Sequence, residues 1–326
     1  MSAASDTTSL PELGVVFPAH AAVEELPTFA AAVEAAGYER LWLIEDCFLA
    51  GGLTMAATAL AVTERLRAGV GLLPAPLRNP ALAAMEIATL ARLHPGRLEV
   101  AFGHGVREWM EQIGALPERR LAALEEVVLA VRRLLAGETV TVAGTHVRLD
   151  GVALETPPAV PPPVLVGTTG PKGMRLAARS ADGLLLPEGC GPALVEWAAS
   201  ELRDERPEGR PRRVVYAWLR VEDDPSAAEA ALRPALEGWL SSGLYPEPLK
   251  RAGVPLPPES EADFQTLARE LAVAGDAPRC AAGIERLAAA GADSVVLAPV
   301  GPDPVGQVER LAEEVLLSSS ASGALR

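Results

Sequence analysis

Residues 66–105 read LRAGVGLLPAPLRNPALAAMEIATLARLHPGRLEVAFGHG and contain one complete strand–helix–strand unit. The first part, residues 66–73, is mostly apolar and predicts a buried strand. Asn79 and Pro80 then begin a helix, because asparagine caps free N–H groups and proline fits the first helical position. A second apolar run at residues 98–102 predicts the next strand. Strands joined through a helix in this way lie parallel, so the stretch predicts an α/β fold.

The same alternation continues along the chain. The apolar runs show no in–out alternation, as expected for strands that are buried on both faces. Strands are predicted at residues 13–17, 41–44, 66–73, 98–102, 164–166, 184–186, 213–220 and 294–299, and helices at 27–36, 53–63, 79–92, 117–135, 174–179, 284–290 and 305–317. Eight such units in a chain of this length favour a (β/α)8 TIM barrel over a doubly wound sheet. We therefore predict one barrel domain over residues 1–326.

Two segments interrupt the alternation. Residues 139–149 alternate in polarity around Ala143-Gly144 and predict a β-hairpin. Residues 222–276 are rich in proline and show no clear period. We predict that this second segment is an irregular insertion between the seventh and eighth strands.

The composition argues against several classes of partner. A formal net charge of −14 repels nucleic acid and anionic membranes, so we expect neither as a partner. No apolar run reaches the roughly 20 residues that cross a bilayer, and the N-terminus lacks the pattern of a signal peptide. The three cysteines, Cys47, Cys190 and Cys280, lie far apart without a CxxC motif, which argues against disulfides and a metal site. We expect a cytoplasmic protein that holds no metal.

Two acidic residues directly follow the second predicted strand. In a TIM barrel the active site lies where the strands end, at their carboxyl side. Glu45 and Asp46 occupy such a place, and a carboxyl group there can serve as acid, base or hydrogen-bond acceptor. A solvated turn with a helix cap would explain the two acidic residues equally well.

The third strand and the loop after it hold candidate ligand contacts. Gly69 and Gly71 lie inside the strand, and glycine there usually marks a bulge or a close backbone approach. Packing in an alanine-rich chain is the alternative. Arg78 and Asn79 precede a helix whose free N–H groups could receive an anion. A helix cap beside a surface arginine is equally open at this position.

The fourth strand ends in Gly103-His104-Gly105. The third glycine of a dinucleotide-binding fingerprint is missing, because residues 106–108 read VRE. His104 is still the histidine with the best position, and we expect it to touch a cofactor or act in catalysis. A structural histidine is the alternative.

The fifth strand runs into the turn GTTGPKG, residues 167–173. Glycines, hydroxyl groups and backbone N–H groups at a helix start suit a phosphate, although the spacing differs from a Walker A loop. An ordinary turn is the alternative. The predicted phosphate-binding residues are Gly167, Thr168, Thr169, Gly170, Lys172 and Gly173.

Taken in order, these motifs resemble the bacterial luciferase-like family of flavin- and F420-dependent oxidoreductases, especially the branch of methylenetetrahydromethanopterin reductase. The resemblance spans about residues 13–299. It is carried by LWLIED, RLRAGVGLLPAPLRNP, HPGRLEVAFGHG and PPPVLVGTTGPKGMRLAARSADG. It implies a TIM barrel that binds FMN or the deazaflavin F420 at the carboxyl end of its strands.

The resemblance also implies how a cofactor is held. In the deazaflavin branch the central ring rests on a third-strand bulge with a non-prolyl cis peptide, which by position is Gly71–Leu72. The family's phosphate-contacting turn matches residues 168–173. Relatives that oxidise sugar phosphates carry other acid/base residues at Glu45-Asp46 and at Val106, so the resemblance leaves the substrate open.

The function we expect is hydride transfer between F420 and a small organic substrate, with His104 and Asp46 handling the proton. The alternative is an FMN-dependent monooxygenase that uses reduced flavin and O2. A barrel that binds the cofactor without catalysis is more remote. A Schiff-base aldolase would need a lysine at the end of a strand, and Lys172 lies in a turn. A homodimer is compatible with the family, but the sequence shows no interface pattern.

Overall fold

The computed structural model describes residues 11–243 and 246–316, and within them eight parallel strands close into a barrel. The barrel strands follow one another around the ring in chain order, and pairing of the seventh strand with both the sixth and the eighth completes the closure. They are β1 (Glu12–Val16), β2 (Arg40–Leu43), β3 (Arg67–Pro74), β4 (Leu98–Gly103), β7 (Val164–Gly167), β8 (Gly183–Leu186), β9 (Arg212–Val221) and β11 (Ser294–Pro299). The predicted TIM barrel is confirmed.

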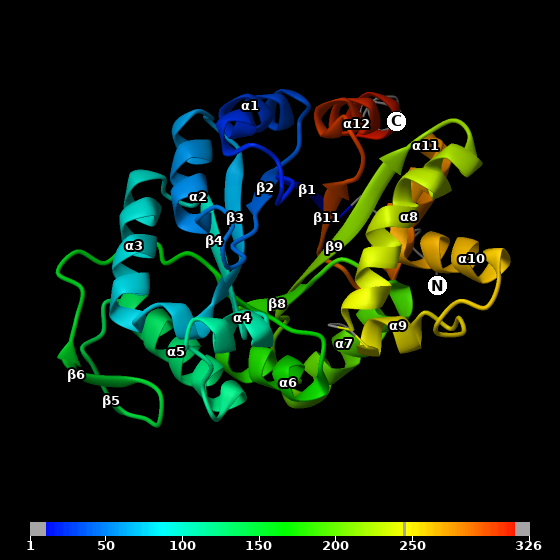
Figure 1. Ribbon diagram of the computed structural model, residues 1–326. Helices are drawn as coiled ribbons and strands as arrows, with labels where there is room; N and C mark the ends of the chain where they lie inside the picture. The colour runs from blue at the N-terminus through cyan, green and yellow to red at the C-terminus, as the bar shows by residue number, and fades with distance from the viewer. Residues whose placement is uncertain (1–10, 244–245, 317–326) are drawn as a thin grey trace, which may run out of the picture.

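Helices surround this barrel (Figure 1). Those that connect successive barrel strands are α1 (Leu26–Ala35), α2 (Gly52–Ala61), α3 (Pro80–Leu93), α5 (Arg120–Leu135), α6 (Pro171–Ser180), α7 (Pro192–Glu205) and α11 (Ala277–Ala289), and α12 (Pro304–Leu311) follows the last strand. Short 3-10 turns lie at η1 (Val23–Glu25) and η2 (Ala75–Leu77), and α12 continues into a π-helical turn, η3 (Ala312–Leu316). The sequence did not predict α7 or the short α4 (Arg107–Gln112).

The start of α3 confirms the local argument made from Asn79 and Pro80. The Asn79 side chain accepts a hydrogen bond from the N–H of Ala81 at 2.9 Å, and Pro80 occupies the first helical turn. The cap satisfies a backbone donor that the helix itself leaves free. The Asn79 side chain therefore caps α3.

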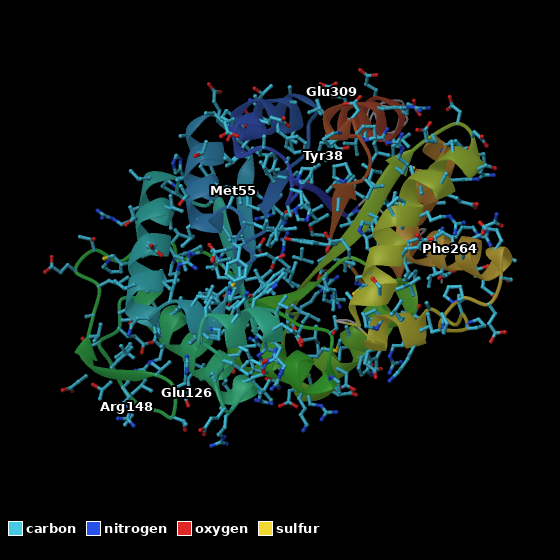
Figure 2. The ribbon with its side chains drawn as sticks, in the orientation of Figure 1. Tyr38, Met55, Glu126, Arg148, Phe264 and Glu309 are labelled. Atoms are coloured by element: carbon cyan, nitrogen blue, oxygen red, sulfur yellow. The ribbon has the colours of Figure 1, made fainter. Side chains whose placement is uncertain are left out.

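The hairpin predicted at residues 139–149 is confirmed as β5 (Val140–Ala143) paired antiparallel with β6 (Arg148–Val152). Glu126 of α5 holds its turn by accepting the N–H groups of Thr145, His146 and Val147 (Figure 2). The hairpin lies at the outer edge of the molecule beside α5, away from the insertion described next (Figure 1).

The prediction that residues 222–276 are irregular is wrong. The segment does lie between the seventh and eighth barrel strands, but it consists of α8 (Pro225–Ser242), α9 (Pro246–Arg251), α10 (Glu261–Leu271) and β10 (Ala272–Gly275). Two of its prolines begin helices, and Asp224 and Ser260 cap α8 and α10 through their side chains. Proline in the first turn of a helix does not destabilise it, so the many prolines of this segment did not indicate irregular structure.

Two distinct layers fill the barrel interior. At the amino-terminal end of the strands, Glu12, Arg40, Glu99 and Arg212 form a network of ion pairs. Above it, the ring of Trp42 meets that of Tyr216 edge to face, with centroids 5.6 Å apart. Apolar side chains of α8, α9 and α10 extend this upper layer, so the insertion packs against the open end of the barrel.

Within the described residues no helix is both long enough and apolar enough to span a bilayer, and no cluster of three or more potential metal ligands is found.

Candidate active site

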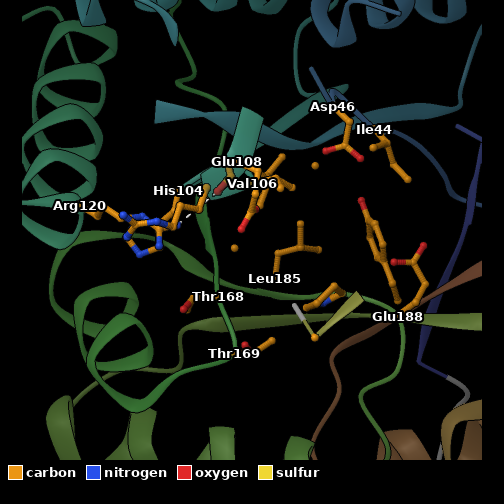
Figure 3. A pocket seen from close by; sticks show the side chains of 18 residues that line it. Ile44, Asp46, His104, Val106, Glu108, Arg120, Thr168, Thr169, Leu185 and Glu188 are labelled. Carbon is orange, nitrogen blue, oxygen red and sulfur yellow. Dashed lines mark hydrogen bonds between the residues drawn. The ribbon is translucent and has the colours of Figure 1, made fainter. Parts of the chain in front are cut away.

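A cavity of about 380 Å³ opens where the barrel strands end at their carboxyl side (Figure 3). Its volume falls within the usual range for small-molecule sites. The lining is made by residues of β3, β7, β8 and β9, by the loops after β2, β4, β7 and β8, by the starts of α4 and α5, and by Gly243 of the insertion. Of the residues predicted from the sequence, those in the lining are Asp46, Gly71, Leu72, His104, Gly167, Thr168 and Thr169.

The floor of the cavity is a bulge in β3. The pairing of β3 with β4 shifts register between Val70 and Leu73, and the Gly71–Leu72 peptide bond is cis, as the resemblance implied. The bulge places Gly71 and Leu72 in the cavity wall. The glycine-rich third strand therefore gives the backbone distortion that the sequence predicted.

Three glycines make room for this bulge. A Cβ atom added at Gly167 would lie 2.6 Å from Leu72 Cδ2, and one added at Gly103 would clash with the same side chain. At Gly71, an added Cβ would lie 2.5 Å from the Tyr216 hydroxyl and 2.8 Å from Leu185 Cδ2. Gly103 is not itself part of the lining; it lets the Leu72 side chain adopt its position.

The turn after β7 forms a second part of the same cavity. Thr168 and Thr169 line it, and the N–H of Gly170 donates to Thr168 Oγ1 at 3.4 Å. Gly173 lies under Thr168, where any side chain would collide with the threonine. Lys172 is exposed and outside the lining, so it brings no lysine amine into the cavity for an aldolase.

Arg120, at the first position of α5, adds a cation to the lining. One of its terminal nitrogens donates to the carbonyl of Gly105 at 3.3 Å. Its Nε is buried without a hydrogen-bond partner among the described residues. Since a buried guanidinium N–H is costly to leave unpaired, this atom indicates that an acceptor belongs in the cavity.

His104 lies beside Arg120 in Figure 3. Burial, reinforced by the nearby charge of Arg120, lowers the pKa of His104 to about 4, and a backbone hydrogen bond with Arg120 opposes this only in part. The imidazole is therefore neutral at physiological pH. In that form one ring nitrogen donates a hydrogen bond and the other accepts one.

The opposite side of the cavity is acidic, with Asp46 and Glu188 both facing it (Figure 3). Burial raises the pKa of Asp46, with Glu45 adding to the rise and His20 opposing it. Burial and the charge of Asp46 raise the pKa of Glu188 to about 7. The cavity therefore has a cationic side and an anionic side.

Glu45 and Arg78 pair with each other away from the cavity lining. Arg78 Nη2 donates to Glu45 Oε2 at 2.9 Å, and a second, shorter contact makes the pair bidentate. Glu45 Oε2 also accepts the N–H of Gly52, at the start of α2, at 2.8 Å. The structure thus brings Asp46 into the cavity and uses its neighbour Glu45 to anchor the loop.

Among the lining residues that the sequence reasoning missed, Arg120, Glu188 and Tyr216 carry the polar groups used below. Two of them carried a usable signal. Glu188 lies two residues beyond the sixth strand, at the same kind of strand exit as Asp46. Arg120 is a cation at a helix start, where the helix dipole disfavours positive charge. Tyr216 lies within an apolar strand and gave no such signal.

Comparison with known proteins gives four concordant matches. Residues 5–294 match the luciferase-like monooxygenase family. The chain is 24% identical to 5,10-methylenetetrahydromethanopterin reductase of Methanolobus tindarius, over 93% of this chain and 99% of that protein. It is 30% identical to F420-dependent glucose-6-phosphate dehydrogenase of Nakamurella multipartita, over 78% of each. The coenzyme F420-dependent tetrahydromethanopterin reductase of Methanopyrus kandleri superimposes with a TM-score of 0.83 at 20% identity, over 95% of this chain and 99% of that one.

Proposed function

Because the chain belongs to the luciferase-like monooxygenase family, we propose that it is an F420-dependent oxidoreductase that moves a hydride between the deazaflavin and a small organic substrate. One observation carries the proposal. The β3 bulge at Gly71–Leu72 and the turn Gly167–Thr169 line the same cavity, although about 95 residues separate them in the sequence. A planar ring with an anionic tail needs both features within reach of each other.

The residues present fit such a cofactor. Gly71 and Gly167 contribute backbone to the cavity lining, and neighbouring side chains leave no room for a Cβ at either position. Backbone without a side chain suits the close approach of a flat ring. The unpaired Nε of Arg120 and the N-terminus of α6 can receive phosphate oxygens. When bound, the deazaflavin supplies a carbon that accepts or donates hydride.

The protein's own contribution is position and proton handling. We assign the neutral imidazole of His104 to hydrogen bonding at the cofactor side. The carboxyl of Asp46 lies at the substrate side, where its charge acts on the carboxyl of Glu188. Glu45 and Arg78 act indirectly, by anchoring the loop that carries Asp46.

An absorbance titration with F420 and FMN, side by side, tests the proposal. We expect saturable binding of F420 and weaker binding of FMN. Tighter binding of FMN, with O2 consumption stimulated by a substrate, would instead establish the monooxygenase alternative. Binding of F420 with no turnover across a broad substrate panel would leave a cofactor-binding barrel without catalysis.

Replacement of Arg120 by alanine tests whether this residue binds the phosphate of the cofactor. We expect the Kd for F420 to rise by roughly 10- to 100-fold, because a charge-assisted hydrogen bond to a partly buried phosphate contributes about 1.5–3 kcal/mol. The loss should shrink as salt is raised, since salt screens the interaction in the wild type. Arg210→Ala is the matched control, because Arg210 is exposed, lies outside the cavity lining and pairs with Asp293 at 3.1 Å. Equal effects of the two substitutions would contradict the assignment of Arg120.

We further propose that the protein forms a homodimer through the outer face of α3. Leu82, Met85 and Leu93 of this helix are 55%, 51% and 68% exposed. Large apolar side chains gathered on one helix face commonly mark an interface, and a two-fold axis brings the same face of both copies together. The three cysteines are free thiols, which supports a reducing compartment such as the cytoplasm.

Light scattering coupled to gel filtration tests the dimer. The double variant Leu82→Glu/Met85→Glu should halve the measured mass, because charge on both copies would meet across the axis. Leu256→Glu is the control and should leave the mass unchanged. Leu256 is 37% exposed and lies between α9 and α10 of the insertion, which Figure 1 shows on the other side of the barrel from α3. A dimer that survives the double variant would place the interface elsewhere.

A further inference from the structure

The acidic side of the cavity has features that the cofactor does not require. Glu188, Asp46 and Tyr216 all line it. The two arginines of the lining, Arg107 and Arg120, both come from the segment after β4, and Arg120 lies on the side of His104, opposite Glu188 (Figure 3). An anionic tail held by Arg120 leaves the acidic side free for the substrate.

The fold holds Glu188 rigidly. It lies in the loop after β8, and the next residue, Gly189, has a φ of +80° and packs so closely on the ring of Trp239 that no side chain would fit. Trp239 belongs to α8 of the insertion and also meets the ring of Trp218 edge to face. The insertion therefore fixes the backbone that presents the Glu188 carboxyl.

Tyr216 completes a group of polar atoms around that carboxyl. Its hydroxyl is buried and has no hydrogen-bond partner among the described residues. Burial, the charge of Glu188 and that of Glu99 raise the pKa of Tyr216 well above its usual value, so this hydroxyl keeps its proton. A buried hydroxyl without a partner is costly, and a substrate oxygen would satisfy it.

We propose that Glu188 exchanges the substrate's proton during hydride transfer, that the Tyr216 hydroxyl donates to the same substrate oxygen, and that this acidic side selects an uncharged alcohol or ketone over phosphorylated or carboxylated substrates. The inference rests on the proposed F420-dependent function and deepens it. Glu188, Tyr216 and the substrate class are its new elements.

The chemical step balances with the residues and cofactor already named. In the oxidative direction, the carbinol C–H bond breaks with its electron pair, which leaves as hydride for the deazaflavin. The O–H bond breaks towards Glu188, whose carboxylate takes the proton, and the carbonyl double bond forms. The alcohol is oxidised, the deazaflavin is reduced, and Glu188 returns its proton to solvent.

The titratable groups around Glu188 suit this role. Asp46 lies on the same side of the cavity, Tyr216 lies on β9, and Cys190 follows Glu188 in the same loop. Glu108 of α4 also lines the cavity. Burial and the charge of Glu188 keep the thiol of Cys190 protonated by raising its pKa. With Asp46 charged, a pKa of Glu188 of about 7 lets it donate a proton below neutral pH and accept one above it.

The same charges account for the selectivity. A phosphate or carboxylate brought between Asp46 and Glu188 would meet like charge in a partly desolvated site and would find no cation on this side to pair with. An uncharged oxygen instead finds one donor, Tyr216, and one proton acceptor, Glu188.

The experiment compares wild type with Glu188→Gln, Tyr216→Phe and the control Glu196→Gln, an exposed residue of α7. The first readout needs no cofactor. Infrared difference spectra of the free protein between pH 5 and pH 9 should show a carboxyl that titrates near 7, and Glu188→Gln alone should remove it. Absence of that signal in the wild type would overturn the proton role.

The second readout uses the F420-loaded enzyme with short secondary alcohols and ketones, each paired with a carboxylated analogue such as lactate or pyruvate. Oxidation should rise with pH to a plateau above about 7, because Glu188 must be deprotonated, and ketone reduction should fall over the same range. Glu188→Gln should lower kcat about 100-fold or more, abolish this pH dependence and leave the Kd for F420 within about twofold. Tyr216→Phe should mainly raise KM.

The outcomes distinguish the proposed function from the role of Glu188. Failure of the wild type and of all variants to bind F420 would reject the proposed function. Normal F420 binding with an unchanged pH profile in Glu188→Gln would reject only the role of Glu188. Turnover confined to the carboxylated substrates, or absent with all uncharged ones, would overturn the selectivity.

Discussion

Glu99→Gln should lower the free energy of unfolding by about 3 kcal/mol or more, because Glu12 alone then faces both Arg40 and Arg212 and one buried positive charge is left uncompensated. Glu99 is completely buried in the barrel floor, with one carboxylate oxygen 2.9 Å from Arg40 Nη1 and the other 3.4 Å from Arg212 Nε. Burial raises the pKa of Glu99, and the two arginines oppose that rise. Denaturant unfolding of the purified protein measures the loss.

Glu39→Gln is the matched control for this experiment. Glu39 is more than half exposed, and its carboxylate lies 3.9 Å from Arg67 Nη1 at the same end of the barrel. Exposed pairs of this kind contribute about 1 kcal/mol or less. If both substitutions cost the same, the barrel floor would not depend on its central carboxylate.

Acid should destabilise the wild type through His104. The pKa of His104 is about 4 in the folded protein and 6.5 in a free histidine, so the unfolded chain binds a proton that the folded chain refuses between these values. Stability therefore falls as pH drops from about 6.5 to 4. At 1.36 kcal/mol per pKa unit, the loss of unfolding free energy reaches about 3 kcal/mol. Because His104 is only partly buried, water in the cavity screens the effect and reduces the loss to about 2 kcal/mol.

The measurement compares unfolding free energies of wild type and His104→Gln at pH 7 and pH 4.5. The difference between the variants isolates His104, because the raised pKa values of Asp46 and Glu188 favour the folded state in acid and act equally in both proteins. The variant should lose less stability on acidification. His146→Gln, at an exposed position in the turn between β5 and β6, should behave as wild type. Parallel curves for His104→Gln and wild type would contradict the buried, neutral imidazole.

The barrel could be predicted from sequence because its signals are local. Apolar runs such as residues 13–17 and 294–299 become strands within one residue of the expected bounds. The prediction failed for residues 222–276, because proline was read as a sign of irregular structure without regard to its position at the start of a helix. Pro225 and Pro246 begin helices of the insertion, so they did not mark irregular structure.

The candidate site was likewise predictable from the sequence only in part. Asp46, His104 and Thr168 follow strands, and the geometry of a parallel barrel gathers all strand ends at one mouth. Glu45 shows the limit of that argument, since consecutive residues point in different directions and only the fold reveals that Arg78 pairs with Glu45. Which of two adjacent acids faces a cavity is set by contacts far along the chain.

By itself, the sequence determined the alternation of strands and helices and the distortion of the glycine-rich third strand, because each depends on neighbouring residues. Phosphate binding by the turn at residues 167–173 stays a prediction. Only the tertiary structure decided that Glu188, Tyr216 and Asp46 share one wall of the cavity opposite Arg120 and His104. Burial and through-space charge produce the shifted pKa values of that wall, and both depend on residues brought together from distant strands.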